Sequence, residues 1–542
     1  MPSVKKEVKD LKRLEKILSV FFKYELASWF GNPVGKAKPS KRAQAKTKAQ
    51  RLRLAFEELG GTFIKLGQLL SLRPDLVSRE YSEEFAKLQD NVKPVPFSQI
   101  KHTLETDFRK SLSRIFKTFD PKPIAAASIG QVHRAMLHSG QQVAVKIKRH
   151  GIKELFETDI DLLYYLANKI KNKFELVDPV QIVDEFRQYT EHELDYIHEA
   201  KNIDKFYQQF KADPITKIPK LYWEYTTPNV LTMEYIAGTE ISDKARLSKL
   251  GYNPKKIAEN LVDSIFKQIF IHGVFHADPH PANVFALKDN KIALLDFGIV
   301  GFLDDSLKQN SADLFCALIN ADVEFLAECL LSLGFIDAPI NMDALKADLV
   351  ENLGEYRGTT LKYLNLSDLF HKILAIARKY HIKLPVNFVL MGKAIITVES
   401  SCAILYPEFN LLAESKPFVK KLEAENTNPK IALTRILKHA HKFRKFLSRL
   451  PEQSEQLLME FKDTDRTIKD IHKDIQGLTK ELGKAANHLI FGIIVVALII
   501  GGVLLMPYDQ AMVMGIPKYT FIYLSIAGII MAFLLISNLR GD

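Results

Sequence analysis

The apolar and polar positions of this chain predict a body that mixes strands and helices. Gln142 to Ile147 alternates at every second residue, as a strand with two different faces does. Val230 to Tyr235 is a buried strand by its apolar content and then becomes polar. Apolar residues at helical spacing predict a helix from about Arg51 to Leu72 and another over Leu303 to Ala317.

Two runs near the C-terminus have a different pattern, because they carry no charge at all. Leu489 to Met506 and Tyr519 to Ser537 are each long enough to cross a hydrocarbon core of about 30 Å. The competing interpretation, a pair of core helices, would usually leave a polar stripe on each helix. Lys480, Lys484 and Arg540 flank the outer ends, so the positive-inside rule puts both ends in the cytoplasm and the short loop outside.

Composition agrees with a cytoplasmic body on a membrane anchor. The 542 residues are 47% hydrophobic, enough for a two-lobed domain with extensions. Three widely spaced cysteines give neither a disulfide framework nor a zinc spacing, and a reducing compartment fits them. Charges interrupt the N-terminus before its first apolar residues, so no cleavable signal is predicted.

The net charge of +11 is concentrated in basic segments. Gly35 to Arg53 is basic without an acid, and Lys430 to Leu450 sets apolar residues against lysine and arginine at helical spacing. No base-reading motif accompanies them, so nucleic acid is not a predicted partner. Anionic lipid headgroups are the simpler partner, although a solvated linker explains the first segment equally well. Glu452 to Lys484 is highly charged and predicts a helical stalk.

The strongest chemical signal is a polar motif that begins at His276. It contains Asp278 and Asn283, and Asp296 opens an Asp-Phe-Gly sequence after the apolar run 292–295. Phosphoryl transfer needs a carboxylate near the attacking oxygen, a carboxamide on Mg²⁺ and a second carboxylate between Mg²⁺ and the phosphates. The three residues are of these types at kinase-like spacing. They predict Asp278 as the catalytic base and Asn283 and Asp296 as metal ligands.

A site of this kind also requires a lysine on a strand to hold the ATP phosphates and an acid to orient it. Lys146 ends a Val-Ala-Val-Lys sequence on the predicted strand and is the candidate. An acid-rich helical segment supplies possible partners, which are Glu193, Asp195 and Glu199. As an alternative, these acids are solvated charges on a helix face. Glu234 and Tyr235, where the apolar strand turns polar, are the candidates for the hinge over the adenine.

The chain departs from ordinary kinases where a glycine-rich loop should precede the lysine strand. The candidate nucleotide loop instead consists of Ala125, Ala126, Ala127, Ser128, Ile129, Gly130, Gln131 and Val132. Alanine has less freedom than glycine to press its backbone against phosphates, so the nucleotide should sit differently. A helix-like segment follows Asp296 within a few residues, so the usual peptide-docking segment is missing. His280 replaces a common kinase lysine, which also disfavours a protein substrate.

Together these motifs resemble the UbiB (AarF) family of atypical kinase-like proteins, which is tied to ubiquinone biosynthesis. The family signature Lys-x-Gly-Gln matches Lys65, Gly67 and Gln68, and the resemblance spans roughly residues 55 to 410. Without the family, Gly67 would simply permit close helix packing. The resemblance implies that Lys65 and Gln68 join Asp278 in the catalytic group and occupy the place of a substrate peptide. Ala282 departs from the glycine usual in the family.

The resemblance implies further that Lys65 pairs with Glu193 or Asp195 as a regulatory ion pair, and that Glu199 is the better partner for Lys146. Sequence does not decide which carboxylate meets which lysine. The implied pocket is occluded and suits ATP hydrolysis or a small substrate better than protein phosphorylation. ATP and Mg²⁺ are the implied cofactors.

These observations predict an α+β, two-lobed protein-kinase-like fold with an N-terminal helical extension and a C-terminal two-helix transmembrane anchor. The predicted divisions are a basic region, the helical extension, an N-lobe, a C-lobe, the amphipathic helix with stalk, and the hairpin: 1–54, 55–117, 118–238, 239–412, 413–485 and 486–542. The predicted function is an atypical kinase-like ATPase supporting ubiquinone biosynthesis at the cytoplasmic face of the inner membrane. Anionic lipids and ubiquinone precursors or biosynthetic enzymes are its predicted partners. A membrane-anchored protein kinase and a nucleotide-binding scaffold without turnover are the alternatives, and no oligomeric state is predicted.

Overall fold

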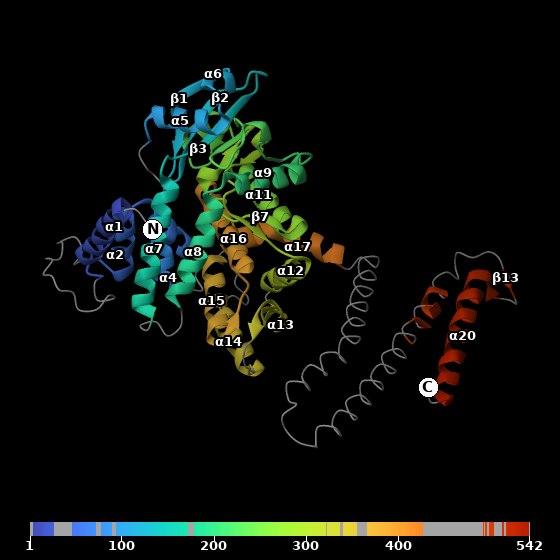
Figure 1. Ribbon diagram of the computed structural model, residues 1–542. Coiled ribbons are helices and arrows are strands. Elements are labelled where there is room, and N and C mark those ends of the chain that lie inside the picture. The colour runs from blue at the N-terminus through green and yellow to red at the C-terminus, as the bar shows by residue number, and fades with distance from the viewer. Residues whose placement is uncertain are drawn as a thin grey trace. The chain divides into compact units, whose positions relative to one another are not determined.

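The computed structural model describes residues 4–26, 46–71, 77–88, 94–171, 178–320, 322–336, 340–354 and 366–426, and, nearer the C-terminus, 492, 494–495, 498–502, 512–513 and 516–540. The chain divides into two compact units, residues 1–422 and 423–542. The first unit has the two-lobed kinase-like arrangement that the sequence predicts, with the strands β1 to β3 at its top in the view of Figure 1.

A four-stranded antiparallel sheet forms the N-lobe, in the order β1-β2-β3-β5. Its strands are β1 (Thr118–Ala126), β2 (Gly130–Met136), β3 (Gln142–Lys148) and β5 (Val230–Glu234). Because side chains alternate along a strand, β3 has two different faces. Val143, Val145 and Ile147 join the apolar cluster under α5 (Phe97–Phe108) and α6 (Leu112–Ile115). Lys146 lies on the opposite face.

Three helices lie between β3 and β5 along the chain. They are α7 (Ile152–Ile170), α8 (Pro179–Glu193) and α9 (Tyr196–Phe210). Asp178 and Asp195 begin α8 and α9 by accepting hydrogen bonds from the backbone N–H groups of Val180 and Ile197. Such caps satisfy N–H groups that a helix start leaves open. The Asp195 cap fixes the point at which the chain turns from α8 into α9.

An N-terminal helical extension packs against α7 and α8 (Figure 1). It contains α1 (Val4–Lys23), α2 (Lys48–Leu59), α3 (Gly61–Ser71) and α4 (Arg79–Phe85). The single helix expected from Arg51 to Leu72 is therefore wrong, because the chain breaks at Gly60, whose φ is +81°. Glycine adopts this angle without steric cost, and the break turns α3 relative to α2.

The C-lobe contains the largest apolar core among the described residues. Its second sheet has the order β4-β9-β8-β6, and two short pairs, β7 with β10 and β11 with β12, lie outside it. The strands are β4 (Thr216–Lys217), β6 (Thr239–Glu240), β7 (Val274–His276), β8 (Val284–Ala286), β9 (Ile292–Leu294), β10 (Val300–Phe302), β11 (Phe335–Ile336) and β12 (Ile382–Lys383). The helices are α10 (Lys244–Lys249), α11 (Pro254–Phe266), α12 (Asp305–Asn320), α13 (Val323–Leu333), α14 (Met342–Gly354), α15 (Leu366–Lys379), α16 (Val386–Leu405) and α17 (Leu411–Asn426).

Short 3₁₀ turns at Trp223–Tyr225, Pro281–Asn283 and Lys288–Asn290 and a π-helical turn at Lys267–His272 complete this unit. Only Ile299, β10 and the residues Leu303 and Asp304 separate the Asp-Phe-Gly motif from α12. No long activation segment therefore fits between the motif and that helix.

The second unit contains β13 (Met512–Val513), β14 (Ile516–Pro517) and α20 (Lys518–Arg540). Among the described residues, one helix, α16, is long and apolar enough to span a membrane, with a mean hydropathy of 1.7. That helix is a C-lobe core element, since residues such as Phe388 and Val398 are fully buried. In α20, Lys518–Ile530 is an apolar stretch that is shorter than a membrane span. The two-helix anchor stays a prediction, because most of its first run lies outside the described residues.

The predicted amphipathic helix Lys430 to Leu450 and the stalk Glu452 to Lys484 also lie outside the described residues, as does most of the basic run Gly35 to Arg53.

Candidate active site

Lys146 occupies the centre of the site. In the sheet register it lies opposite Val132 on β2 and Leu231 on β5, which puts its side chain on the face toward α9. Its Nζ donates to both carboxylate oxygens of Glu199 at 2.9 Å and lies 3.6 Å from Asp296 Oδ2. The structure thus pairs Lys146 with Glu199 and brings the Asp-Phe-Gly carboxylate close to the same ammonium.

Lys146, Glu199 and Asp296 shift one another's pKa values. The Lys146 ammonium holds the pKa of Asp296 down at about 2. Burial lowers the pKa of Lys146, but Asp296 and Glu199 outweigh it, so that the pKa lies above its ordinary value. Burial raises the pKa of Glu199, which is 6% exposed, and Lys146 offsets only part of that increase. Asp296 is therefore ready to accept a cation, whereas Glu199 depends on Lys146 for its charge.

Hydrogen bonds to His276 and between backbone groups shape the catalytic loop. The N–H of Asp278 donates to His276 Nδ1 at 3.2 Å, and His276 Nε2 donates to the carbonyl of Leu295 at 3.1 Å. Asn283 Nδ2 donates to the carbonyl of Asp278 at 3.1 Å, and the N–H of Leu295 donates to the carbonyl of Asn283 at 2.9 Å. The catalytic loop and the Asp-Phe-Gly motif are consequently one connected unit, and buried His276 joins its two halves.

The backbone at Asp296 is strained, with a φ of +58° that non-glycine residues rarely adopt. The N–H of Gly298 donates to Asp296 Oδ1 at 3.1 Å and supports this conformation. Phe297 is fully buried against Phe206 of α9, and Asn202 donates to its carbonyl at 3.0 Å. Helix α9 therefore positions both Glu199 and the metal-binding motif.

Asn283 and Asp296 have the chemistry for Mg²⁺. Asn283 uses its Nδ2 in the loop, which leaves Oδ1 as a ligand atom, and Asp296 is half-exposed and ionised. The described residues contain no cluster of three or more His, Cys, Asp or Glu side chains that would hold a metal alone. That fits a kinase-like site, where phosphate oxygens complete the coordination of Mg²⁺.

Lys65 reaches the site from α3. Its Nζ lies 3.0 Å from Glu193 Oε1, and Tyr189 donates its hydroxyl to the same oxygen at 3.0 Å. The side chains of Lys65 and Glu193 are only 13% and 10% exposed. Lys65 also contributes to lowering the pKa of Asp296, so its charge reaches the metal-binding motif. Of the two partners left open by the sequence, the structure selects Glu193, because Asp195 is the cap of α9.

Gln68 lies one turn after Lys65 but serves a different purpose. Its Nε2 donates to the carbonyl of Leu88 at 3.3 Å, which ties α3 to the segment after α4. An added Cβ on Gly67 would overlap Leu88 and Phe56, so the helices pack closely there. In this structure Gln68 is a packing residue beside the site.

The alanine-rich loop is held from two sides. Arg149 Nε donates to the carbonyl of Ala127 at 3.0 Å, and the Arg149 N–H donates to the carbonyl of Ile129 at 2.8 Å. Ile129 is buried in the core of the helical extension. Gly130 leaves no room for a side chain, because a Cβ would lie 2.6 Å from the Ile147 carbonyl oxygen and would also overlap the Tyr196 hydroxyl. The loop is therefore fixed before any nucleotide binds.

Gln131 and Ser128 of the predicted nucleotide loop are both buried. Gln131 lies on the outer face of the sheet, where it accepts from the Val95 N–H at 2.9 Å and bonds to His133 at 2.8 Å. The alternation of β2 sends Val132, not Gln131, toward Lys146. Ser128 is 4% exposed, and its hydroxyl has no hydrogen-bond partner among the described residues.

The predicted hinge residues use their polar groups to tie the lobes together. Glu234 pairs with Lys217 at 2.9 Å, and the N–H of Tyr235 donates to the carbonyl of Gln142 at 3.1 Å. The face that carries Lys146 is instead apolar at Ala144 and Met233, which are opposite each other in the register. These are functional candidates that the sequence reasoning missed, although the alternation of the strands contains the signal.

A second missed residue is Lys393 on α16. Its burial lowers its pKa, and the carboxylate of Asp278 partly restores it, so the two charges lie near each other. Helix α16 also contacts the catalytic loop through Ser401, whose hydroxyl donates to the carbonyl of Pro279 at 3.1 Å. His280, by contrast, is exposed, and its Nδ1 accepts from the Ala282 N–H. The cation near Asp278 therefore comes from a distant helix, for which no local sequence signal exists.

The fold and this site define a kinase-like protein with an atypical nucleotide loop. The ABC1 atypical kinase-like domain matches residues 87–330, the UbiB helical domain matches 350–410, and the ABC1/UbiB kinase-like C-terminal domain matches 473–540. The chain belongs to the ABC1/UbiB family of atypical kinase-like proteins.

Relatives with this similarity occur in bacteria and plants. A protein of Clostridium pasteurianum described as an uncharacterized protein in the hydrogenase 1 5′ region is 33% identical over 503 residues, covering 92% of this chain and 94% of that protein. The probable protein kinase UbiB of Cellvibrio japonicus is 32% identical, covering 75% of each. The chloroplastic protein ACTIVITY OF BC1 COMPLEX KINASE 7 of Arabidopsis thaliana is 33% identical, covering 72% of this chain and 56% of that protein.

Among solved structures, the complex of Rv3197 with erythromycin from Mycobacterium tuberculosis aligns with a TM-score of 0.48 and 23% identity, covering 68% of this chain and 94% of that one.

Proposed function

We propose that this protein is an Mg²⁺-dependent ATPase of the kinase-like type that supports ubiquinone biosynthesis at a membrane. The observation that carries the proposal is the position of Lys146, whose ammonium is 2.9 Å from Glu199 and 3.6 Å from Asp296. In this arrangement Lys146 would hold the α- and β-phosphates, and Asp296 and Asn283 would hold Mg²⁺, which when bound supplies positive charge to the phosphates.

Asp278 is the candidate base for the nucleophile. It lies on the catalytic loop next to His276, and the charge of Lys393 is close to it. A carboxylate accepts the proton of an attacking hydroxyl or water, and a nearby ammonium stabilises the negative charge that the transferred phosphoryl group carries. Lys65 is unsuited to this step, because the ion pair with Glu193 keeps its proton in place.

Water or a small acceptor is favoured over a protein hydroxyl. The pair of Lys65 and Glu193 occupies the substrate side, and α12 begins at Asp305, a few residues after the Asp-Phe-Gly motif. A peptide would have neither the usual docking segment nor an open approach to Asp278. ATP hydrolysis could then drive the handling of lipid intermediates or of the enzymes that modify them.

The ubiquinone link and the membrane site rest on the family and on the sequence. Relatives carry the name UbiB, and the apolar C-terminal runs and the basic segment Lys430 to Leu450 suit an anionic membrane surface. The localisation proposed is the cytoplasmic face of the inner membrane.

The decisive experiment measures ATP turnover by the purified full-length protein. It should be done with and without anionic lipid vesicles and with and without a phenol that resembles a quinone precursor. We expect Mg²⁺-dependent phosphate release that these additions stimulate, and no release by Asp278→Asn with nucleotide binding retained. Nucleotide binding without turnover under all conditions would favour the scaffold, and labelled phosphate on a partner protein would favour the protein kinase.

A further inference from the structure

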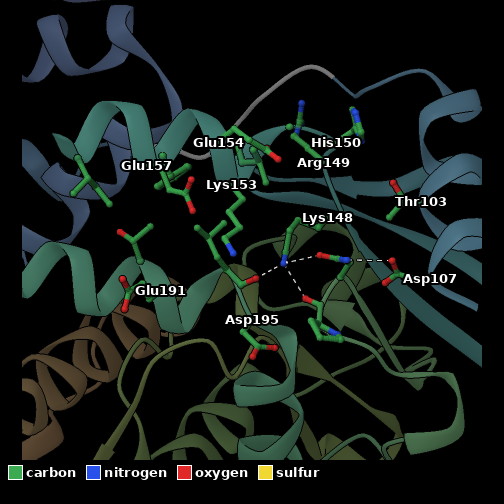
Figure 2. A pocket seen from close by; sticks show the side chains of 18 of the residues that line it. Thr103, Asp107, Lys148, Arg149, His150, Lys153, Glu154, Glu157, Glu191 and Asp195 are labelled. Atoms are coloured by element: carbon green, nitrogen blue, oxygen red, sulfur yellow. Dashed lines mark hydrogen bonds between the residues drawn. The ribbon is translucent and has the colours of Figure 1, made fainter. Parts of the chain in front are cut away.

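The structure shows a cavity at the end of β3, and Lys148 is one of the residues that line it (Figure 2). This cavity of about 900 Å³ lies between α5, the start of α7 and the end of α8, away from Lys146 and the metal ligands. Lys148 is 7% exposed and ends β3 two residues after Lys146. Its ammonium donates to the carbonyl of Leu194, to the carbonyl of Pro228 at 2.9 Å and to Asn229 Oδ1 at 2.9 Å.

The first of these acceptors lies at the corner between α8 and α9. Glu193, one residue before Leu194, is the carboxylate that pairs with Lys65. Asp195, one residue after it, caps α9, and α9 carries Glu199 to Lys146 one turn later. Both active-site ion pairs therefore depend on where this corner lies, and Lys148 bonds to its central carbonyl.

The other two acceptors connect the same ammonium to the turn before β5. The carbonyl of Pro228 also accepts from the Tyr196 N–H at 3.2 Å, and Asn229 Nδ2 donates to Asp107 Oδ1 at 3.1 Å, as Figure 2 shows for Asp107. The N–H of Lys148 donates to the carbonyl of Asn229 at 2.9 Å. Lys148 thus joins β3, the α8–α9 corner and the turn before β5 at one atom.

Lys148 carries its charge in an environment that does not favour it. All three acceptors are neutral oxygens, and burial lowers the pKa of Lys148 to about 8. Asp195 and Asp107 face the ammonium and raise its pKa, and Lys153 on α7 lowers it. Tyr196, which separates Lys148 from Lys146, has a pKa raised by burial. An ammonium in such a place stabilises the fold little, and its three directed bonds are its distinctive contribution.

We propose that Lys148 is a positioning residue for the nucleotide site, holding the α8–α9 corner so that Glu199 meets Lys146 and Glu193 meets Lys65. The inference rests on the proposed function, because its effect is on the binding of Mg²⁺ and ATP. Lys148 itself touches neither the phosphates nor the metal ligands.

Deprotonation of Lys148 should change the affinity for MgATP, which a side chain that only fills space would not do. An ammonium has three N–H donors, whereas the neutral amine has two, so one of the three oxygens loses its donor. Affinity for MgATP should fall as the pH rises through about 8, the pKa of Lys148. The contribution of Lys148 to folding stability should instead increase with pH. Between that pKa and the ordinary lysine value the unfolded chain binds more protons, so the contribution of this group to folding stability increases with pH.

The test compares the full-length protein with three variants at pH 7 and pH 9, using a fluorescent ATP analogue with Mg²⁺ and thermal unfolding. Lys148→Met should raise the Kd for the analogue on the order of tenfold at pH 7, the loss typical of a charged hydrogen bond, and should flatten the pH dependence. Lys148→Arg keeps a charge at both pH values and should restore much of the affinity without the pH dependence. Lys153→Met, an exposed lysine of the same cavity, is the control. Its Kd at pH 7 should equal that of the wild type, and its pH dependence should be retained but moved to higher pH, because Lys153 lowers the pKa of Lys148.

The outcomes separate this inference from the proposed function. Wild-type protein without Mg²⁺-dependent nucleotide binding would remove the proposed function itself. Wild-type binding with an unchanged Kd in Lys148→Met, or an equal loss in Lys153→Met, would overturn the role of Lys148 alone. If Lys148→Met does not fold, Asn229→Ala removes one acceptor and should show a smaller loss of affinity in the same direction, and unchanged affinity there would also overturn the inference.

Discussion

The ion pair between Lys65 and Glu193 gives the sharpest test of the occluded site. Lys65→Met removes the ammonium that lies 3.0 Å from Glu193 Oε1, while the hydroxyl of Tyr189 remains on that oxygen. The other carboxylate oxygen, Oε2, is buried without a partner among the described residues. The carboxylate would therefore be left with a single hydrogen bond in a site that is about one-tenth exposed.

The expected loss of folding stability follows from this burial. Removing one partner of a buried ion pair lowers the free energy of unfolding by about 3–5 kcal/mol. Because Glu193 keeps its hydrogen bond from Tyr189 and is slightly exposed, we expect a loss of about 3 kcal/mol for Lys65→Met. Glu193→Gln removes the charge but keeps an acceptor for Tyr189. In the double variant no charge is left unpaired, so the two effects should not add, and the coupling should be about 2 kcal/mol.

Lys65→Met should lower folding stability but should not weaken nucleotide binding. Under the proposed function, in which the pair of Lys65 and Glu193 occupies the substrate side, Lys65→Met should keep or tighten MgATP binding and should permit autophosphorylation. Unfolding of the single and double variants by heat and denaturant gives the coupling, and labelled ATP gives the phosphorylation. Additive stability effects within about 0.5 kcal/mol would refute the coupling, and loss of nucleotide binding in Lys65→Met would refute the inhibitory role.

Three further predictions concern the nucleotide, the loop and pH. Asp296→Asn should weaken Mg²⁺-dependent ATP binding at least tenfold while the protein remains folded, and calorimetric titration with and without Mg²⁺ measures this; equal affinities would reject Asp296 as a ligand. Gly130→Ala should destabilise by about 1–3 kcal/mol, since its Cβ overlaps the Ile147 carbonyl, whereas Gly140→Ala, at a position with open space but a φ of +93°, tests the cost of backbone strain alone. Burial raises the pKa of Glu199, so ATP affinity should fall on acidification as Glu199 gains a proton and releases Lys146. Glu199→Gln should have the lower affinity at neutral pH and should lack this acid limb, so that the two proteins converge at low pH; an unchanged acid limb in that variant would assign it to another group.

The local patterns predicted those parts of the site that depend on spacing within one segment. Asp278, Asn283 and Asp296 are close because a short loop and two short strands join them, and Lys146 lies on β3 as the alternation indicates. The kinase-like fold with a helical extension is confirmed. The single helix from Arg51 to Leu72 failed because one glycine, Gly60, takes a backbone angle that apolar periodicity does not reveal.

Pairings between distant segments were decided only when the chain folded. Glu193, Asp195 and Glu199 are equivalent acids in the sequence, yet one pairs with Lys65, one caps α9 and one pairs with Lys146. The break between α8 and α9 separates them, since a change of axis directs neighbouring side chains to different places. Lys393 approaches Asp278 and Lys148 holds the α8–α9 corner for the same reason. Sequence determines residue types, periodicity and short-range spacing, whereas the energy of a buried charge depends on the atoms that surround it, and tertiary packing alone brings those together.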